Sequence, residues 1–181
     1  MIKLNYVTIE KASVANGTGV RVVLWCSGCN CKCKGCQNPE TWDFNYGKPF
    51  DKQAYDALYD ALNHDYVKGL TLSGGHPLEY DNLLEIYDII QFVKTKFPTK
   101  DIWLYTGYTL KVFDFDTSVD VCWDNGLLRN HILTKCDYVV DGPYIEEQRD
   151  ITLKFRGSSN QRIIDVKKTI KNKSITLMEE G

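Results

Sequence analysis

Short apolar runs alternate along the chain with segments of helical periodicity. Residues 20–25 (VRVVLW), 69–72 (GLTL), 101–105 (DIWLY) and 136–140 (CDYVV) are brief runs rich in β-branched and aromatic residues, and they predict buried strands. The apolar stretch 163–166 predicts a fifth strand. These runs are too short to form helices of ordinary length.

Two segments between the predicted strands have helical spacing. In residues 52–62, Tyr55, Leu58 and Leu62 share one face, and Asp51 is placed to cap the first turn. Residues 82–97 form the clearest helix, which Pro98 ends. Its apolar face consists of Leu83, Ile86, Ile90, Val93 and Phe97. The pattern in 109–135 is ambiguous, and it predicts a helix only over 126–134.

The alternation of strands and helices predicts an α/β fold with a mostly parallel sheet. A polar or glycine-rich turn follows each of four predicted strands, at 26–29, 73–77, 106–108 and 141–143. Parallel strands would bring these turns to one edge, where α/β folds place their chemistry. A complete eight-stranded barrel needs about 250 residues. We therefore expect a single domain over 1–181, folded as a partial (β/α) barrel of about five or six mostly parallel strands with an open side.

Composition and charge narrow the class of protein. The 181 residues are 43% hydrophobic and 25% charged, which is ordinary for a soluble globular protein. A net charge of -2 provides no basic surface for nucleic acid. No run reaches the roughly 20 apolar residues that span a membrane, and the first residues lack the apolar core of a signal peptide. The expected location is the cytoplasm.

Cysteine is the residue type that points to chemistry. Five of the seven cysteines lie within the 11 positions from Cys26 to Cys36. Disulfides closing such short loops would stabilise little, so metal binding in a reducing compartment explains the crowding better. Cys29, Cys33 and Cys36 form C-x3-C-x2-C directly after a strand. Three thiolates can hold three irons of a [4Fe-4S] cluster and leave the fourth iron without a protein ligand.

Two other uses of these cysteines stay open from spacing alone. Cys26 with Cys29, and Cys33 with Cys36, are zinc-knuckle pairs, although fewer residues separate the pairs than in typical zinc sites. Reactive thiols without a metal are the other alternative. Cys26 is expected to be a small buried hydrophobic residue, yet it or Cys31 could supply a fourth ligand.

Two cysteines lie far from this group. Cys122 and Cys136 are isolated in the sequence and are expected in the core.

A series of motifs resembles the family of anaerobic ribonucleoside-triphosphate reductase activating proteins, which are radical S-adenosylmethionine enzymes. The resemblance covers about residues 14–165 in one order, and six motifs in series make it specific. The motifs are Asn16-Gly17-Thr18-Gly19-Val20-Arg21, Ser27-Gly28-Cys29-x3-Cys33-x-Gly35-Cys36-x-Asn38 with Thr41-Trp42, Leu70-Thr71-Leu72-Ser73-Gly74-Gly75-x-Pro77-Leu78, Asp101-Ile102-Trp103-x2-Thr106-Gly107-Tyr108, Val140-Asp141-Gly142, and Arg156-Gly157-Ser158-Ser159-Asn160-Gln161.

The resemblance implies a function for the cysteine motif. Cys29, Cys33 and Cys36 would bind the cluster, and S-adenosyl-L-methionine would chelate the open iron. One electron would cleave the cosubstrate to methionine and a 5′-deoxyadenosyl radical, which would abstract hydrogen from a glycine of the partner reductase. Cluster and cosubstrate would carry this chemistry, so no side chain is assigned a catalytic role.

The resemblance also implies which residues bind the cosubstrate. Gly74 and Gly75 match the family's glycine pair, although a tight turn would also explain them. Gly35, Cys36 and Gln37 would run along the cosubstrate.

His76 departs from the family pattern, because the position after the glycine pair is usually acidic. Neutral imidazole accepts hydrogen bonds less well than a carboxylate. A lone loop histidine is usually solvated, but our hypothesis is that His76 contacts the cosubstrate.

Other polar and aromatic residues have structural roles as alternatives to roles in the site. Asp141 would face the pocket or begin a turn, and residues 156–160 would line its opening or form a polar turn. Four aromatic residues are expected to serve packing: Trp25, Trp42, Trp103 and Tyr105.

The partners follow from what the chain lacks. A single cysteine group implies one cluster and an external electron donor, flavodoxin-like or similar. The chain is too small for a nucleotide-reducing site, so an activator of the reductase large subunit is expected. Alternatives are another radical S-adenosylmethionine enzyme, such as an activase of a different glycyl-radical protein, a zinc-binding module without catalysis, and an electron carrier.

Overall fold

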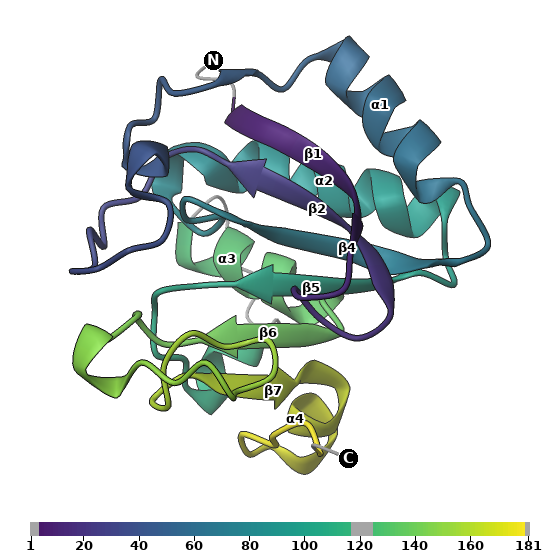
Figure 1. Ribbon diagram of the computed structural model, residues 1–181. Helices are drawn as coiled ribbons and strands as arrows, with labels where there is room; N and C mark the ends of the chain where they lie inside the picture. Colours follow the sequence, from purple (N-terminus) through teal and green to yellow (C-terminus); the bar gives the residue numbers. More distant parts are fainter. Residues whose placement is uncertain (1–3, 117–124, 180–181) are drawn as a thin grey trace.

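One seven-stranded sheet organises the computed structural model, which describes residues 4–116 and 125–179. The strand order is β3-β1-β2-β4-β5-β6-β7 (Figure 1). The strands are β1 (Asn5–Ser13), β2 (Val20–Cys26), β3 (Lys48–Pro49), β4 (Val67–Gly74), β5 (Asp101–Tyr105), β6 (Tyr138–Asp141) and β7 (Arg162–Asp165).

The centre of the sheet is parallel and its edges are antiparallel. β2, β4, β5 and β6 run parallel, whereas β1 pairs antiparallel with β2 and β3, and β7 pairs antiparallel with β6. The predicted open α/β sheet is confirmed, but the predicted partial barrel of about five or six mostly parallel strands is not: the sheet has seven strands, and three of its six pairings are antiparallel. The cause is connection length, because residues 14–19 are too few for a parallel crossover between β1 and β2.

Helices and short 3-10 segments connect the strands. Helix α1 has the predicted bounds, and the Asp51 carboxylate accepts a hydrogen bond from the Ala54 N–H. Val166, which was predicted in the last strand, begins α4, because Asp165 caps that helix through the Lys168 N–H. The helices are α1 (Lys52–Leu62), α2 (Leu83–Lys96), α3 (Asn125–Lys135) and α4 (Val166–Asn172); the 3-10 segments are η1 (Pro39–Trp42), η2 (Tyr80–Asn82), η3 (Val112–Phe115) and η4 (Glu146–Gln148).

The main core lies between the sheet and the helices α1, α2 and α3. Figure 1 shows how these helices are placed relative to the strands. The core includes Leu58 of α1, Ile90 of α2 and Ile132 of α3, packed against strand residues such as Leu72 and Leu104. Within the ranges that the structure describes, no helix is long and apolar enough to cross a membrane.

The opposite face of the sheet has a smaller apolar cluster and a buried cation. Arg21 of β2 is fully buried; it donates to Thr71 of β4 at 2.8 Å and pairs with Asp101 of β5 at 2.6 Å. Its guanidinium lies 5.5 Å from the centre of the Trp103 ring. Arg21 thus links the neighbouring strands β2, β4 and β5.

Candidate functional site

The four predicted turns meet at the carboxyl ends of the parallel strands. They border a cavity of about 200 Å³. The lining includes residues from the turns after β2, β4, β5 and β6, together with Asn16 and residues of η1. The prediction that the polar turns lie at one edge of the sheet is confirmed.

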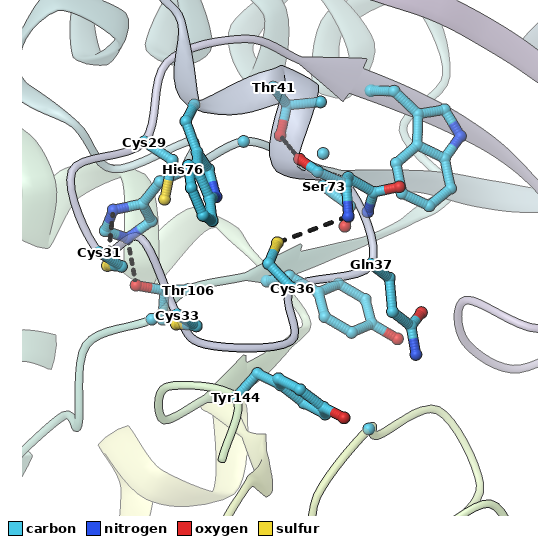
Figure 2. Close-up of a pocket in the computed structure, with 18 of the residues that line it drawn as sticks. Cys29, Cys31, Cys33, Cys36, Gln37, Thr41, Ser73, His76, Thr106 and Tyr144 are labelled. Carbon is cyan, nitrogen blue, oxygen red and sulfur yellow. Dashed lines mark hydrogen bonds between the residues drawn. The ribbon is translucent and has the colours of Figure 1, made fainter. Parts of the chain in front are cut away.

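The cysteine loop, residues 27–38, lies along this cavity. Cys29, Cys31, Cys33 and Cys36 all line it and are partly exposed (Figure 2). Cys26 instead ends β2, is 1% exposed and belongs to the main core, as predicted. The partly exposed sulfurs are chemically suited to an iron–sulfur cluster, whereas Cys26 is not directed into the cavity lining.

Backbone hydrogen bonds hold the start of this loop. The Gly28 N–H donates to the Thr41 carbonyl at 2.8 Å, and the Cys29 N–H donates to the Trp42 carbonyl at 3.2 Å. Further along, the Cys36 sulfur accepts the Asn38 N–H at 3.4 Å. The segment η1 therefore supports the start of the cysteine loop.

The cysteines differ in how easily they lose a proton. A hydrogen bond from Cys31 lowers the pKa of Cys29 to about 6, although burial opposes this shift. The same hydrogen bond, reinforced by burial, raises the pKa of Cys31. Burial raises the pKa of Cys33, and it raises that of Cys26 to about 12. Cys29 is therefore poised to be a thiolate near neutral pH.

The glycine pair lets the β4 turn approach the cysteine loop. Gly74 has φ +103°, and a Cβ on it would lie 2.6 Å from the carbonyl oxygen of Cys26. A Cβ on Gly75 would lie 2.7 Å from the carbonyl oxygen of Gly28. The Gly75 N–H donates to the Cys26 carbonyl at 2.7 Å. The tight turn is thus observed, while contact of both glycines with a cosubstrate stays a prediction.

His76 is 1% exposed, so it is not the solvated side chain that a lone loop histidine usually is. Its Nδ1 lies 3.0 Å from Oε1 of Glu79. Its Nε2 lies 2.7 Å from Oγ1 of Thr106, as Figure 2 shows for these two side chains. The ring also packs edge-on against Tyr108. His76 lines the cavity, and its contact with a cosubstrate stays a prediction.

Glu79 is a residue that the sequence analysis missed. It is 6% exposed, and its carboxylate accepts the Asn30 N–H at 2.8 Å and the Asn30 side-chain amide at 3.0 Å. Burial alone would raise its pKa, but hydrogen bonds from His76 and Asn30 outweigh burial and lower the pKa to about 2. The sequence signal that could have identified Glu79 was an acidic residue three positions after His76. Glu79 ties the cysteine loop to the β4 turn.

The residues expected beside the cosubstrate divide into two groups. Cys36, Gln37, Gly74, Gly75 and His76 line the cavity. Gly35, at φ +73°, is not part of the lining and packs against Glu146, whose carboxylate would clash with an added Cβ.

The aromatic residues were assigned to packing too broadly. Trp103 is fully buried, as expected, but Trp25, Trp42 and Tyr105 line the cavity, and so does Tyr144. Their sequence contexts do not separate them, because Trp25, Trp103 and Tyr105 all lie in apolar runs that form strands, and which of these side chains reach the cavity depends on tertiary structure.

The remaining predicted residues have mainly structural contacts. Asp141 is fully buried; its carboxylate accepts hydrogen bonds from Arg162 and from the Leu110 N–H. From the segment 156–160, Gly157 lines the cavity. Cys136 is buried as predicted, and Cys122 lies outside the described residues.

Comparison with known proteins agrees with this arrangement. Residues 15–164 match the family model described as "4Fe-4S single cluster domain". A protein from Vibrio cholerae is 39% identical over 162 residues, covering 88% of this chain and 97% of the relative. A protein from Enterobacteria phage T4 is 37% identical over 160 residues (88% and 93%), and one from Escherichia coli strain K12 is 34% identical over 160 residues (87% and 96%).

All three relatives bear the name anaerobic ribonucleoside-triphosphate reductase-activating protein. Both the family model and the relatives cover most of the chain. The chain therefore belongs to the family of anaerobic ribonucleoside-triphosphate reductase-activating proteins and carries its 4Fe-4S domain.

Proposed function

We propose that this protein activates anaerobic ribonucleoside-triphosphate reductase as a radical S-adenosylmethionine enzyme. The observation that carries the proposal is that Cys29, Cys33 and Cys36 border one cavity together with the glycine pair of β4. Relatives that the match covers to 97% and 93% of their own length are named as activators of that reductase.

In this proposal Cys29, Cys33 and Cys36 hold three irons of a [4Fe-4S] cluster. When bound there, the cluster would supply the electron for reductive cleavage of S-adenosylmethionine to methionine and a 5′-deoxyadenosyl radical, which would abstract hydrogen from a glycine of the reductase and leave a glycyl radical. Cys36, Gln37, Gly74, Gly75 and His76 bind the cosubstrate along the cavity, with Gly35 shaping the loop.

The chain itself contributes position and shielding. Glu79 fixes the cysteine loop through Asn30, and Thr106 fixes the His76 ring. The apolar rings of Trp25, Trp42 and Tyr105 border the cavity and reduce its access to water. These contacts hold the reacting groups in place, which is where such a protein contributes to the rate.

Two partners complete the proposal. The open side of the cavity admits a glycine-bearing loop of the reductase large subunit. Because the sequence has a single cysteine group, the electron comes from a separate donor, flavodoxin-like or similar.

The test is reconstitution with iron and sulfide under anaerobic conditions. We expect a brown protein that, once reduced, forms 5′-deoxyadenosine and produces a glycyl radical in the reductase, seen by electron spin resonance. A matched Cys33→Ser variant should do neither. Cleavage without a glycyl radical would indicate a different radical enzyme, and a colourless zinc protein that cleaves nothing would remove the proposal.

A further inference from the structure

A second set of metal-binding side chains overlaps the cysteine motif. The sulfurs of Cys29 and Cys31, a ring nitrogen of His76 and a carboxylate oxygen of Glu79 all lie within 4.8 Å of one another. In the part of the chain that the structure describes, this is the one such group of three or more cysteine, histidine and acidic residues. Cys29 belongs to both sets, whereas Cys31, His76 and Glu79 are not in the predicted cluster triad.

The histidine is oriented as a metal ligand would be. Its Nδ1 is turned toward the other donors, 3.9 Å from the Cys31 sulfur and 3.0 Å from Glu79 Oε1. Its Nε2 lies 2.7 Å from the Thr106 hydroxyl, on the far side of the ring. Ligating histidines usually bond a second protein group through the other nitrogen, which fixes the tautomer. In the zinc-bound form the Thr106 hydroxyl would accept this bond from Nε2–H, and the imidazole proton would shift to Nε2 from Nδ1, which donates to Glu79 in the metal-free protein.

Hydrogen bonds from Asn30 also fix the position of the Glu79 carboxylate. Asn30 donates its backbone N–H to Oε1 and its side-chain amide to Oε2 of Glu79. Glu79 is nearly buried, so few other positions are open to its side chain. Outer hydrogen bonds of this kind hold a ligating carboxylate in place.

The donor set and its access both suit zinc. Two thiolates, one imidazole and one carboxylate make a four-coordinate set, and tetrahedral zinc keeps its ligand atoms roughly 3.3–3.8 Å apart. Cys31 is partly exposed, so rotation of its side chain can bring the sulfur closer. An ion can reach the group through the cavity, which Cys29, Cys31 and His76 line.

We propose that the cluster-free protein binds one Zn²⁺ through Cys29, Cys31, His76 and Glu79, and that zinc and the iron–sulfur cluster exclude each other. Zinc binding depends only on these four residues. The exclusion rests on the proposed function, because it requires Cys29 to be a cluster ligand as well. This site differs from the zinc-knuckle alternative, which would use Cys29 together with the buried Cys26, Cys33 and Cys36.

The first experiment titrates cluster-free, reduced protein with Zn²⁺ under anaerobic conditions against a chromogenic chelator. We expect one Zn²⁺ per chain. Cys31→Ser and Glu79→Gln should each weaken zinc affinity by about tenfold or more, since each removes a ligand. Cys33→Ser and Glu40→Gln serve as controls and should bind as the wild type does. Thermal unfolding of each variant, followed by circular dichroism, checks that the fold is kept.

Two results would overturn the site. One is the absence of stoichiometric zinc binding in the folded wild type. The other is a loss of affinity in Cys33→Ser as large as that in Cys31→Ser, which would assign zinc to the knuckle cysteines. Cobalt absorption bands give a second readout, because replacing the Cys31 thiolate should weaken the sulfur-to-cobalt charge-transfer band.

A second experiment adds iron and sulfide to zinc-loaded protein and follows cluster absorbance. We expect cluster formation to be slowed until a chelator removes zinc; formation at an unchanged rate with zinc still bound would refute exclusion. If zinc binds as described but no cluster ever forms in zinc-free protein, the proposed function fails and the zinc site stands. If the cluster forms but zinc does not bind, the zinc site fails and the proposed function stands.

Discussion

At the scale of single residues, Glu79 is the contact that joins the two halves of the site. Its carboxylate accepts two hydrogen bonds from Asn30 and one from His76 while nearly buried. Hydrogen bonds to a buried charged group each contribute more than those between neutral groups. The cysteine loop thus depends on a residue that is distant from it in the sequence.

We predict that Glu79→Gln lowers the free energy of unfolding by about 1–3 kcal/mol, since the amide keeps the shape but loses the charge and one acceptor. Urea denaturation of the cluster-free protein measures this. Glu40→Gln is the matched control, because Glu40 is exposed in η1. Equal stability of the two variants would show that the Glu79 contacts contribute nothing measurable.

Gly74 carries a constraint of another kind. It combines φ +103° with a backbone oxygen 2.6 Å from the position of an added Cβ. Gly74→Ala should therefore reduce stability by about 1–2 kcal/mol or more through backbone strain and the clash.

Gly107→Ala is the comparison for this prediction. An added Cβ there meets only the Cys31 side chain, which can move, and the backbone is not in the left-handed region. Thermal melting of both variants should show the larger loss for Gly74→Ala. A greater loss for Gly107→Ala would contradict the argument.

At the scale of elements, Asp137 joins β6 to its neighbours. Its carboxylate accepts the Ile102 N–H of β5 at 2.9 Å and pairs with Lys94 of α2 at 2.7 Å and Lys167 of α4 at 2.8 Å. Burial would raise the pKa of Asp137, but these donors outweigh burial and hold the pKa below its ordinary value of 3.8.

The sign of the pH dependence follows from that lowered pKa. A group with a depressed pKa in the folded state stabilises fully above its ordinary value and loses this contribution as the pH falls through the folded value. We predict that Asp137→Asn is less stable than the wild type by about 1–3 kcal/mol at neutral pH, and that the difference shrinks below about pH 4. Urea denaturation at several pH values measures it; a constant difference would contradict the prediction.

The central elements could be predicted from the sequence, whereas the edges could not. β2, β4, β5 and β6 are buried on both faces, so their residues form continuous apolar runs. β1 lies nearer the edge, and its half-buried Glu10 and exposed Lys11 broke the apolar pattern. The two-residue strand β3 has no pattern of its own, since pairing with β1 defines it.

The candidate site also has a part that could be predicted from the sequence and a part that could not. The cysteine spacing and the glycine pair are local in sequence, so both could be read directly. The contacts among Asn30, His76, Glu79 and Thr106 span up to 49 residues, and the fold alone brings them together. Trp25 and Trp42 were likewise assigned to packing, because which side of a strand or turn faces the cavity depends on tertiary structure.

At the scale of the whole molecule, the cavity couples segments that are far apart in the chain. The cysteine loop, the β4 turn and the β5 turn all border it, whereas α4 lies at the other end of the strand order beside β7 (Figure 1). A ligand that binds only the folded state stabilises that state, and the local effect is greatest where its contacts are. On the proposed function, cluster loading should therefore act on the three segments together.

We predict that cluster loading slows amide hydrogen exchange in residues 27–38, 74–77 and 105–108, and leaves α4 nearly unchanged. The first segment contains the proposed ligands, and the others are joined to it through Gly75, His76 and Glu79. Exchange followed by mass spectrometry, with Cys33→Ser as the unloaded control, measures this. Slower exchange confined to 27–38 would mean that the hydrogen bonds through His76 and Glu79 do not carry the stabilisation to the other two segments. The cavity would then respond to cluster loading as separate loops rather than as one site.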